Sequence, residues 1–400
     1  MKYILVIGDG MADEPIAALQ DKTPLAYLNL PHFDRVCHTL GKAQTVPAGV
    51  APGSDTAILN IVGYDPRTYY TGRSSLEAAG MGVFLNPGEV SLRVNLCAVE
   101  EGVILSHNGG NIEGQEAIDL METLVADPRF AEKAEKLQLR IHITPTFRHI
   151  GVFRCEDEGA AFTLTPPHDV LGDPIAKHMP KGSLCDELKE LMLVSHEVLD
   201  QHPINVQRRK EGKLPANMIW PWAEARAAQL PSFTQKYGKS GAVISAVPLL
   251  HGIAGLAGLD VIMVEGANGD LDTNYEGKVA AAAEVLKTHD FVCVHVEAPD
   301  EMSHAGSMEK KLKAIAYLNE RVVGPLLEGV KDDFRLLLLS DHPTLLSTRT
   351  HDGHAVPFGI YDSREAEKTA KFCETTCDNG IFVDNGDKLM PLLFEKEDEL

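Results

Sequence analysis

The 400-residue sequence predicts an α/β fold, in which a mostly parallel sheet has helices on both faces and a smaller α/β domain is inserted into it. Three observations predict this fold. Short, almost continuously apolar runs alternate with helical stretches, as in sheets whose strands are buried on both faces. Runs of this kind occur towards both ends of the chain, and the segment between them has a different pattern.

The clearest strands are four apolar runs, at residues 2–8, 258–264, 290–298 and 333–341. Residues 274–289 and 307–330 place apolar side chains at helical spacing and charged side chains on the opposite face. Strands and helices that alternate in this way are typical of parallel sheets with helical crossovers.

The middle of the chain combines alternating strands, two helices, a Pro-rich loop and a charged loop, from about residue 85 to residue 240. Buried strands of the first kind lie on both sides of it. We therefore expect residues 1–84 and 241–400 to form one discontinuous domain, and residues 85–240 to form the insert.

Composition excludes some classes of partner. Asp and Glu number 58 against 37 Lys and Arg, and the net charge of −21 argues against nucleic acid and anionic membranes. Seven scattered cysteines without a CxxC pair fit reduced thiols, and residues 1–10 are typical of a strand rather than a signal peptide. The most apolar stretch, residues 244–264, is interrupted by Pro248 and Asp260. We expect a cytoplasmic protein.

Metal-binding side chains gather where predicted strands end, which is the edge where open parallel sheets bind ligands. Taken singly, each could be a helix cap or an ordinary surface histidine. Carboxylate and imidazole groups together suit Zn, Mn or Fe, and this set exceeds what one tetrahedral site needs. The pattern therefore predicts a two-metal site with room for a bridging substrate oxygen. The residues are Asp9, Asp300, His304, Asp341, His342, His351 and His354.

Ser54, in the stretch "VPAGVAPGSDTAILN", has two interpretations. A serine just before an apolar-periodic run is a preferred helix N-cap. A hydroxyl at a helix N-terminus is also well placed for an anion, and a metal can activate it as a nucleophile without a neighbouring base. The two-metal hypothesis favours the nucleophile.

Six motifs together resemble the cofactor-independent phosphoglycerate mutases of the archaeal type, in the alkaline phosphatase superfamily. They are "GDGMAD", "PGSDTA", "YDPRTYYTGRSSLEAAGMG", "EAPDEMSHAG", "LSDHPT" and "THDGHAVPF". The resemblance implies an alkaline-phosphatase-like catalytic domain with two divalent ions (Mn, Zn or Mg), an inserted cap domain, and no requirement for 2,3-bisphosphoglycerate. One ion would be bound by Asp9, Ser54, Asp341 and His342, and the other by Asp300, His304 and His351, with His354 as the alternative to His351.

The resemblance also implies a reaction. Ser54 would accept the phosphoryl group of 3-phosphoglycerate, the glycerate would reorient beneath the insert, and the phosphoryl group would return to the other hydroxyl. Water must be excluded meanwhile. Residues expected to bind this small phosphorylated acid are Arg148 and His149, which resemble the family's "YRH" element, together with Arg73, Asn217 and Asn268. For Arg73 a structural ion pair is an equal alternative.

The chain departs from the family at "WPWAEARAAQLPSF", where a glycine-rich segment is usual. This difference keeps other functions open. A branch of the family has been proposed to be homoserine kinases of threonine biosynthesis, although no nucleotide-binding loop is visible here. A metal-dependent phosphatase and a metal-stabilised binding protein are further alternatives.

Overall fold

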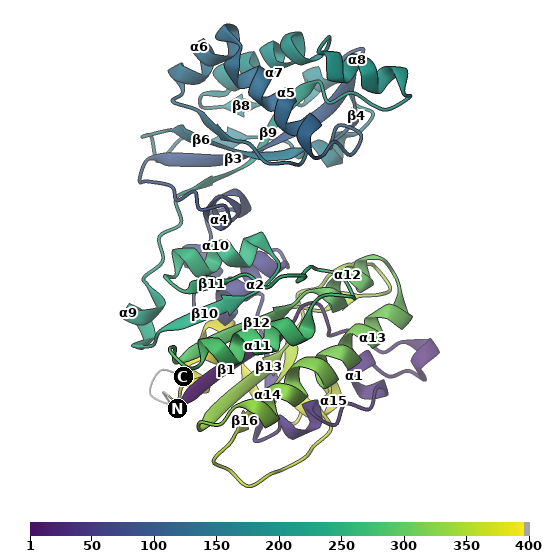
Figure 1. Ribbon diagram of the computed structural model, residues 1–400, viewed down its shortest axis with the longest axis vertical. Coiled ribbons are helices and arrows are strands. Elements are labelled where there is room, and N and C mark those ends of the chain that lie inside the picture. Colours follow the sequence, from purple (N-terminus) through teal and green to yellow (C-terminus); the bar gives the residue numbers. More distant parts are fainter. Residues whose placement is uncertain (396–400) are drawn as a thin grey trace. The chain divides into compact units, whose positions relative to one another are not determined.

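The computed structural model describes residues 1–395, and these form two compact units (Figure 1). Unit 1 comprises residues 1–70 and the chain from residue 229 onward, and unit 2 comprises Thr71–Ala228. Both junctions lie earlier in the chain than the predicted 84/85 and 240/241. The first does so because α4 (Arg73–Gly80) packs on strands of unit 2, and the second because Phe233 stacks on Phe291 of unit 1, with ring centroids 5.0 Å apart.

Unit 1 contains an eight-stranded sheet in the order β11-β10-β12-β1-β13-β16-β2-β17. The first five strands run parallel, whereas β16 is antiparallel to both of its neighbours. The predicted mostly parallel α/β fold is thus confirmed. The strands are β1 (Lys2–Gly8), β2 (Thr39–Ala43), β10 (Gly241–Ile244), β11 (Asp260–Ile262), β12 (Phe291–Val296), β13 (Phe334–Leu339), β16 (Val356–Asp362) and β17 (Ile381–Val383).

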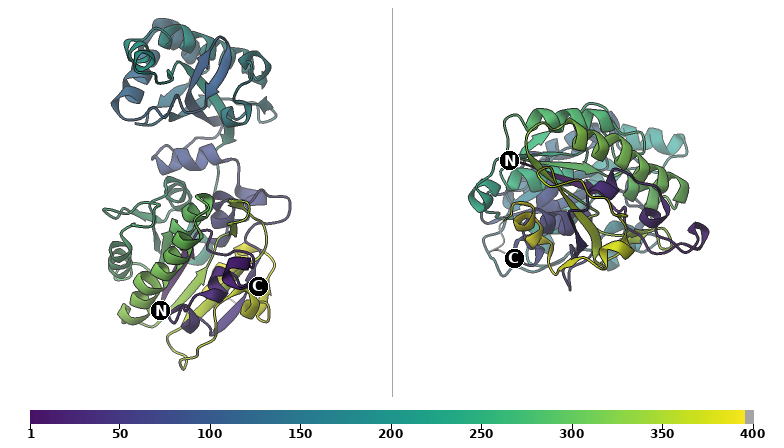
Figure 2. Two further views of the ribbon diagram at one scale, coloured as in Figure 1. Left: turned by 90° about the vertical axis from the view of Figure 1, so that its right-hand side faces the viewer. Right: turned by 90° about the horizontal axis from the view of Figure 1, so that it is seen from below.

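Helices cover this sheet, and Figures 1 and 2 show α11, α13 and α14 side by side over one face. Strand β1 is buried on both faces, because Ile4, Leu5, Val6 and Ile7 are all inaccessible to solvent. The longer helices of unit 1 are α2 (Ser54–Ile61), α10 (Pro248–Leu256), α11 (Tyr275–Val285), α12 (Ala298–His304), α13 (Met308–Leu318) and α14 (Gly324–Gly329). The shorter ones are α1 (Pro24–Tyr27), α3 (Pro66–Tyr69), α9 (Phe233–Tyr237), α15 (Glu374–Cys377) and α16 (Leu389–Leu393).

The single helix predicted over residues 307–330 is interrupted by a π-helical turn, Asn319–Val323, between α13 and α14. The Asn319 carboxamide oxygen accepts hydrogen bonds from the backbone N–H groups of His32 and Phe33, and Pro325 lies in the first turn of α14. A side chain that binds another segment, followed by a proline, explains why the helix does not continue regularly.

Unit 2 is built on a five-stranded antiparallel sheet, in the order β4-β3-β6-β5 with β9 paired to the long central strand β3. Alternate β3 residues, Leu92 and Val94 among them, pack in one core with helices α5 and α7, while Ser91 and Arg93 bind α4. The strands are β3 (Glu89–Glu100), β4 (Val103–Ser106), β5 (Arg140–His142), β6 (Arg148–Arg154) and β9 (Met218–Arg226), and the remaining helices are α5 (Gln115–Ala126), α6 (Pro128–Lys136), α7 (Cys185–Leu199) and α8 (Pro203–Lys210).

Two pairs of short strands complete the structure: β14 (Thr344–Leu345) with β15 (Thr350–His351) in unit 1, and β7 (Phe162–Thr163) with β8 (Lys181–Gly182) in unit 2. Within residues 1–395, none of the helices has the length and apolar character needed to cross a membrane.

Candidate active site

Seven of the predicted site residues meet at one edge of the unit 1 sheet. Asp9 directly follows β1, the pair Asp341 and His342 follows β13, and Ser54 is the first residue of α2. The other three are Asp300 and His304 in α12 and His351 at the end of β15. The parallel register of β12, β1 and β13 brings the ends of these three strands together.

The first group surrounds the Ser54 hydroxyl. Its oxygen lies 3.3 Å from Asp9 Oδ2 and 3.1 Å from His342 Nε2. The same imidazole nitrogen lies 3.2 Å from Asp341 Oδ2 and 3.6 Å from Asp9 Oδ1. Potential ligand atoms of four residues therefore converge on one small volume.

The second group adjoins the first. His304 Nε2 lies 2.9 Å from His351 Nε2 and 3.2 Å from Asp300 Oδ2. The rings of His342 and His351 are 4.1 Å apart, and ligand atoms of Asp300, His342 and His351 lie within 4.8 Å of one another. His342 is therefore close to both groups, whereas the sequence placed it with the first alone.

The electrostatics of the two groups are those of crowded, desolvated carboxylates. Burial, and then the nearby charges of Asp341 and Asp300, raise the pKa of Asp9 well above its usual value. Burial also opposes ionisation of Asp300, yet hydrogen bonds with His304 and His351 hold its pKa well below the usual range. The hydrogen bond to Asp300 is the largest cause that raises the pKa of His304 to about 9.

This donor set fits two divalent cations. The buried Asp341 Oδ2 accepts no hydrogen bond from any described residue, and the facing nitrogens of His304 and His351 can share only one proton between them. Three carboxylates and three imidazoles in this space need positive charge, and oxygen and nitrogen donors suit Zn²⁺ and Mn²⁺.

Ser54 is not the cap of its helix. The N-cap position of α2 is held by Gly53, and in the first turn it is Asp55, not Ser54, whose side chain accepts from a backbone N–H, that of Thr56. The Ser54 side chain points instead to Asp9 and His342. The hydroxyl therefore lies at the helix N-terminus, near backbone N–H groups that have no partner within the helix.

His354 lies apart from the site. Its side chain is 87% exposed and is bonded to Asp352, whereas His351 is part of the second group. The family resemblance favoured His351, and the geometry supports the same choice.

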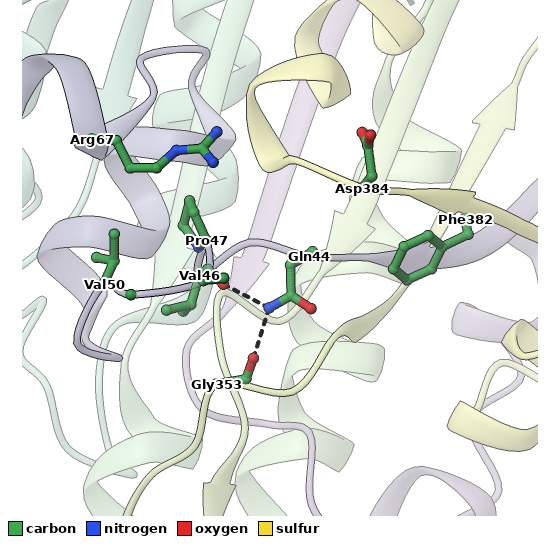
Figure 3. A pocket seen from close by; sticks show the side chains of 10 residues that line it. Gln44, Val46, Pro47, Val50, Arg67, Gly353, Phe382 and Asp384 are labelled. Carbon is green, nitrogen blue, oxygen red and sulfur yellow. Dashed lines mark hydrogen bonds between the residues drawn. The ribbon is translucent and has the colours of Figure 1, made fainter.

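The loops that carry Ser54 and His351 are tied together by Gln44, which follows β2 (Figure 3). Its carboxamide nitrogen donates to the carbonyl oxygens of Val46, at 2.6 Å, and Gly353, at 2.7 Å. Val46 begins the loop that leads to Ser54, and Gly353 lies two residues after His351. These residues also line a cavity of ≈ 550 Å³ that extends to Arg67 and Asp384.

The predicted substrate-binding residues differ in whether their side chains already bond to other residues of the protein. Arg148, at the start of β6, packs its guanidinium on the Phe147 ring and forms no hydrogen bond or ion pair through it with any residue in 1–395. Burial, and then the charge of Arg93, lower its pKa. Arg148 thus has free donors for an anion.

His149 faces the opposite side of the same sheet. It is fully buried and opposite Val94 in the core of unit 2, and burial lowers its pKa to about 4. Its Nδ1 accepts from the backbone N–H of Thr144. Because neighbouring residues of a strand point to opposite faces, Arg148 and His149 are not brought together.

The other three residues are engaged in structure. Arg73 forms an ion pair with Glu77, one turn further along α4, which is the structural alternative considered for it. Asn217 is buried and bonds both the N–H and the C=O of Val99. Asn268 lies in a surface turn, where its carboxamide oxygen accepts from the backbone of Asp270.

The sequence did not predict a role for four residues that lie close to the site or to Arg148, namely Gln44, His107, His295 and Thr344. His295, within β12, contacts Asp9, and Thr344 donates to Asp300 over 2.5 Å. In unit 2 the rings of His107 and Phe147 are in contact, and burial, followed by the charges of His168 and Arg148, lowers the pKa of His107. A histidine within an apolar strand was the available signal for His295, whereas Thr344, Gln44 and His107 carried none.

Comparisons with known proteins show the family of the chain. Residues 38–205 match the family profile described as 2,3-bisphosphoglycerate-independent phosphoglycerate mutase. A probable enzyme of that name from Geobacter sulfurreducens is 44% identical over 99% of this chain and 100% of its own. One from Methanosarcina mazei is 46% identical over 95% of this chain and 96% of its own.

Solved structures share the fold. A Pyrococcus horikoshii protein is 30% identical, with a TM-score of 0.80 over 98% of this chain and 96% of its own. The cofactor-independent phosphoglycerate mutase of Thermoplasma acidophilum is 24% identical, with a TM-score of 0.69 over 99% and 100%. The relatives settle the family, since two of them match at well over 30% identity along nearly their whole length. The chain belongs to the family of 2,3-bisphosphoglycerate-independent phosphoglycerate mutases.

Proposed function

We propose that this chain interconverts 3- and 2-phosphoglycerate, without 2,3-bisphosphoglycerate, through a phosphoserine at Ser54. The observation that carries the proposal is the position of the Ser54 hydroxyl, 3.1 Å from His342 Nε2 and 3.3 Å from Asp9 Oδ2 at the start of α2. The names of the relatives support the same reaction. A small phosphorylated acid as substrate and a cytoplasmic location are part of this proposal.

The proposal includes two divalent cations. Asp9, Ser54, Asp341 and His342 would hold one, and Asp300, His304 and His351 the other. Mn²⁺, Zn²⁺ and Mg²⁺ are the candidates. When bound, the ions supply charge that favours the ionised Ser54 hydroxyl and neutralises phosphoryl oxygens.

The reaction needs two transfers at one serine. In the first, Ser54 Oγ loses its proton and bonds to phosphorus while the bond from phosphorus to the 3-oxygen of the glycerate breaks, and that oxygen gains a proton. In the second, the 2-hydroxyl loses its proton and attacks the phosphoserine, the bond from Oγ to phosphorus breaks, and Ser54 Oγ regains a proton. The backbone N–H groups at the start of α2 are suited to the phosphoryl oxygens. The unpaired guanidinium of Arg148 is suited to a carboxylate or phosphate.

Turnover by the Mn²⁺-loaded protein tests the proposal. We expect conversion of 3- to 2-phosphoglycerate without added 2,3-bisphosphoglycerate. The 2-phosphoglycerate formed is measured by coupling the reaction to enolase. Ser54→Ala should reduce turnover to background and prevent ³²P labelling of the chain. Ser347→Ala, which removes a hydroxyl that donates to exposed Glu14, is the matched control and should keep full activity.

The same assay detects a phosphatase, and a second assay with homoserine and ATP detects a kinase. Net release of phosphate without isomerisation would identify a phosphatase, and ATP-dependent formation of O-phosphohomoserine would identify a kinase. Either result, or metal-loaded protein without any turnover, would contradict the mutase assignment.

A further inference from the structure

His295 lies outside the predicted metal-binding set, yet it contacts that set directly. It is the fifth residue of β12, its side chain is completely buried, and its Nε2 lies 2.9 Å from Asp9 Oδ2. We propose that His295, oriented by Ser245, is a positioning residue that occupies one oxygen of Asp9 and leaves the other for a metal ion. The inference rests on the proposed function only in taking Asp9 as a metal ligand.

The hydrogen bonds fix which ring nitrogen of His295 carries the proton. The backbone N–H of Val247 donates to Ser245 Oγ over 3.0 Å, and Ser245 Oγ lies 3.1 Å from His295 Nδ1. A hydroxyl can accept two hydrogen bonds, so this contact alone sets no direction, but an ionised Asp9 can only accept, which requires the ring proton to be on Nε2. Nδ1 is then the acceptor, and Nε2 carries the proton that it donates to Asp9.

The two oxygens of Asp9 consequently have different surroundings. Oδ2 accepts from His295, whereas Oδ1 is the oxygen 3.6 Å from His342 Nε2. Ser54 Oγ does not distinguish them, since it lies 3.3 Å from Oδ2 and 3.4 Å from Oδ1. Among the described residues, Asp9 forms a possible metal-binding group with Asp341 and His342, and His295 is not part of it. A hydrogen bond to one oxygen stops the carboxylate from rotating and assigns Oδ1 to the metal.

The backbone on either side of this contact is held in place. Ile7 of β1 is paired with His295 of β12, so Asp9 and His295 emerge from neighbouring strands. The buried Lys278 Nζ donates to the carbonyl oxygen of His295 over 2.7 Å. His251 Nε2 lies 2.9 Å from the carbonyl oxygen of Ser245, which follows β10. Three adjacent strands thus position the relay from Ser245 through His295 to Asp9.

Metal titration of three variants tests this role independently of catalysis. Mn²⁺ binding to the whole chain is followed by calorimetry and by the EPR signal of free Mn²⁺. His295→Leu fills the space but cannot donate, and we expect the affinity of one of the two sites to fall about 10- to 100-fold. His295→Gln places a carboxamide N–H near the position of Nε2 and should recover most of that affinity. Ser245→Ala should cause a smaller loss, because Nδ1 then has no donor to fix the ring proton.

His289→Gln is the matched control. It changes a histidine whose Nε2 contacts Asp260 and neither Asp9 nor Ser245, and should leave both Mn²⁺ affinities unchanged. Circular dichroism and thermal unfolding establish that each variant is folded. If His295→Leu does not fold, the comparison of Ser245→Ala and His295→Gln with the wild type decides the question.

Unchanged Mn²⁺ binding in His295→Leu would overturn the inference, as would equal losses in His295→Leu and His295→Gln, which would indicate packing rather than hydrogen bonding. Failure of the proposed function is a different result. A chain that binds two Mn²⁺ ions in this His295-dependent way but does not isomerise phosphoglycerate would contradict the mutase assignment and leave the role of His295 in place.

Discussion

Ser54 and Ser232 occupy similar places in the sequence and different places in the structure. Both stand at the start of a helix, but Ser232 Oγ accepts from the backbone N–H of Gln235 in a complete capping box, whereas Ser54 is the first residue within α2 and its hydroxyl points to Asp9 and His342. The same residue type therefore caps one helix and faces the candidate metal ligands at the other.

This contrast predicts opposite effects of the same substitution. Ser232→Ala should lower the free energy of unfolding by about 1 kcal/mol, because a capping hydrogen bond is lost. Ser54→Ala should change it by less than about 0.5 kcal/mol in metal-free protein while abolishing turnover. Urea denaturation and the mutase assay measure the two effects. A loss of 1 kcal/mol or more in Ser54→Ala would mean that the serine also has a capping role.

Arg148 is expected to act on substrate rather than on stability. Its guanidinium forms no ion pair or hydrogen bond with residues 1–395, and its Nε is buried. Arg148→Met keeps the packing on Phe147 and should leave the free energy of unfolding unchanged or higher, because no buried hydrogen bond is lost. The value of kcat/KM should fall about 10- to 100-fold, as for the loss of one hydrogen bond to a charged group.

Arg154→Met is the control for that substitution. Arg154 ends the same strand and pairs with Glu156 on the surface, so its loss should leave both kcat/KM and stability near wild-type values. Equal kinetic effects at the two positions would show that Arg148 has no specific part in binding.

His149 should make unit 2 sensitive to acid. Its pKa is about 4 in the folded protein, against about 6.5 for an unperturbed histidine. Between these values the unfolded chain binds a proton that the folded chain does not, so the stabilising contribution is complete above pH 6.5 and is lost as the pH falls towards 4. His149→Gln removes this proton and should flatten the decline by up to about 1.4 kcal/mol per pH unit. Urea denaturation of the metal-free wild type and of His149→Gln from pH 8 to 4.5 measures the free energy of unfolding at each pH. The difference in this free energy between the two proteins should stay constant above pH 7. If the two curves remain parallel below pH 6.5, His149 is not the cause of the decline.

At the scale of elements, the Gln44 side chain joins the loops that carry Ser54 and His351. Gln44→Glu keeps the shape of the side chain but replaces a double donor by a carboxylate that faces two carbonyl oxygens. We expect kcat to fall about 100-fold, because displacement of a reacting group by about 1 Å has effects of this size. Gln235→Glu is the matched control, since Gln235 acts there as an acceptor for the Ser232 N–H and a carboxylate can do the same. Similar kcat values for the two variants would contradict a role in positioning the loops.

The sequence predicted those elements whose cause is local. Three of the four apolar runs contain β1, β12 and β13, which are buried on both sides, and the ligands that follow them meet because parallel strands end at one edge. The run at 258–264 was wrongly expected to be a buried strand, since it contains only the short, partly exposed edge strand β11. The π-turn at Asn319 was not predictable, since its cause is a contact with His32 and Phe33 almost 290 residues away. For the same reason, the sequence did not predict that the Asn217 carboxamide bonds to the backbone of Val99, a residue distant in sequence.

At the scale of the whole molecule, the predicted metal ligands and the candidate anion-binding arginine belong to different units. All seven predicted ligands lie in unit 1, whereas Arg148 lies in unit 2. Each unit has its own hydrophobic core, one formed by strands such as β1 and β12 with their helices, the other by β3 and β6 with α5 and α7. Next to the two junctions, hydrogen bonds join the incoming and outgoing chain within each unit. Thr71 donates to the carbonyl oxygen of Arg226 in unit 2, and Tyr64 donates to that of Pro231 in unit 1.

This organisation predicts that unit 1 folds and binds metal without unit 2. A chain in which residues 71–228 are replaced by a short Gly-Ser linker should bind two Mn²⁺ ions with affinities close to those of the whole chain, because every predicted ligand is retained. Ser54 should still accept a phosphoryl group. Nothing from unit 2 would then orient the glycerate or exclude water, so we expect mutase activity to fall by a factor on the order of 100 or more.

The phosphoserine of the deletion variant should instead react with water. Phosphate release from 3-phosphoglycerate or p-nitrophenyl phosphate should therefore exceed isomerisation, which reverses the ratio expected of the whole chain. Adding Ser54→Ala to the deletion should abolish this release, which separates hydrolysis at the serine from hydrolysis elsewhere. Wild-type mutase activity in a folded, metal-binding deletion variant would show that unit 2 does not direct the second transfer. Loss of Mn²⁺ binding in a folded variant would show that the metal centre depends on residues outside unit 1.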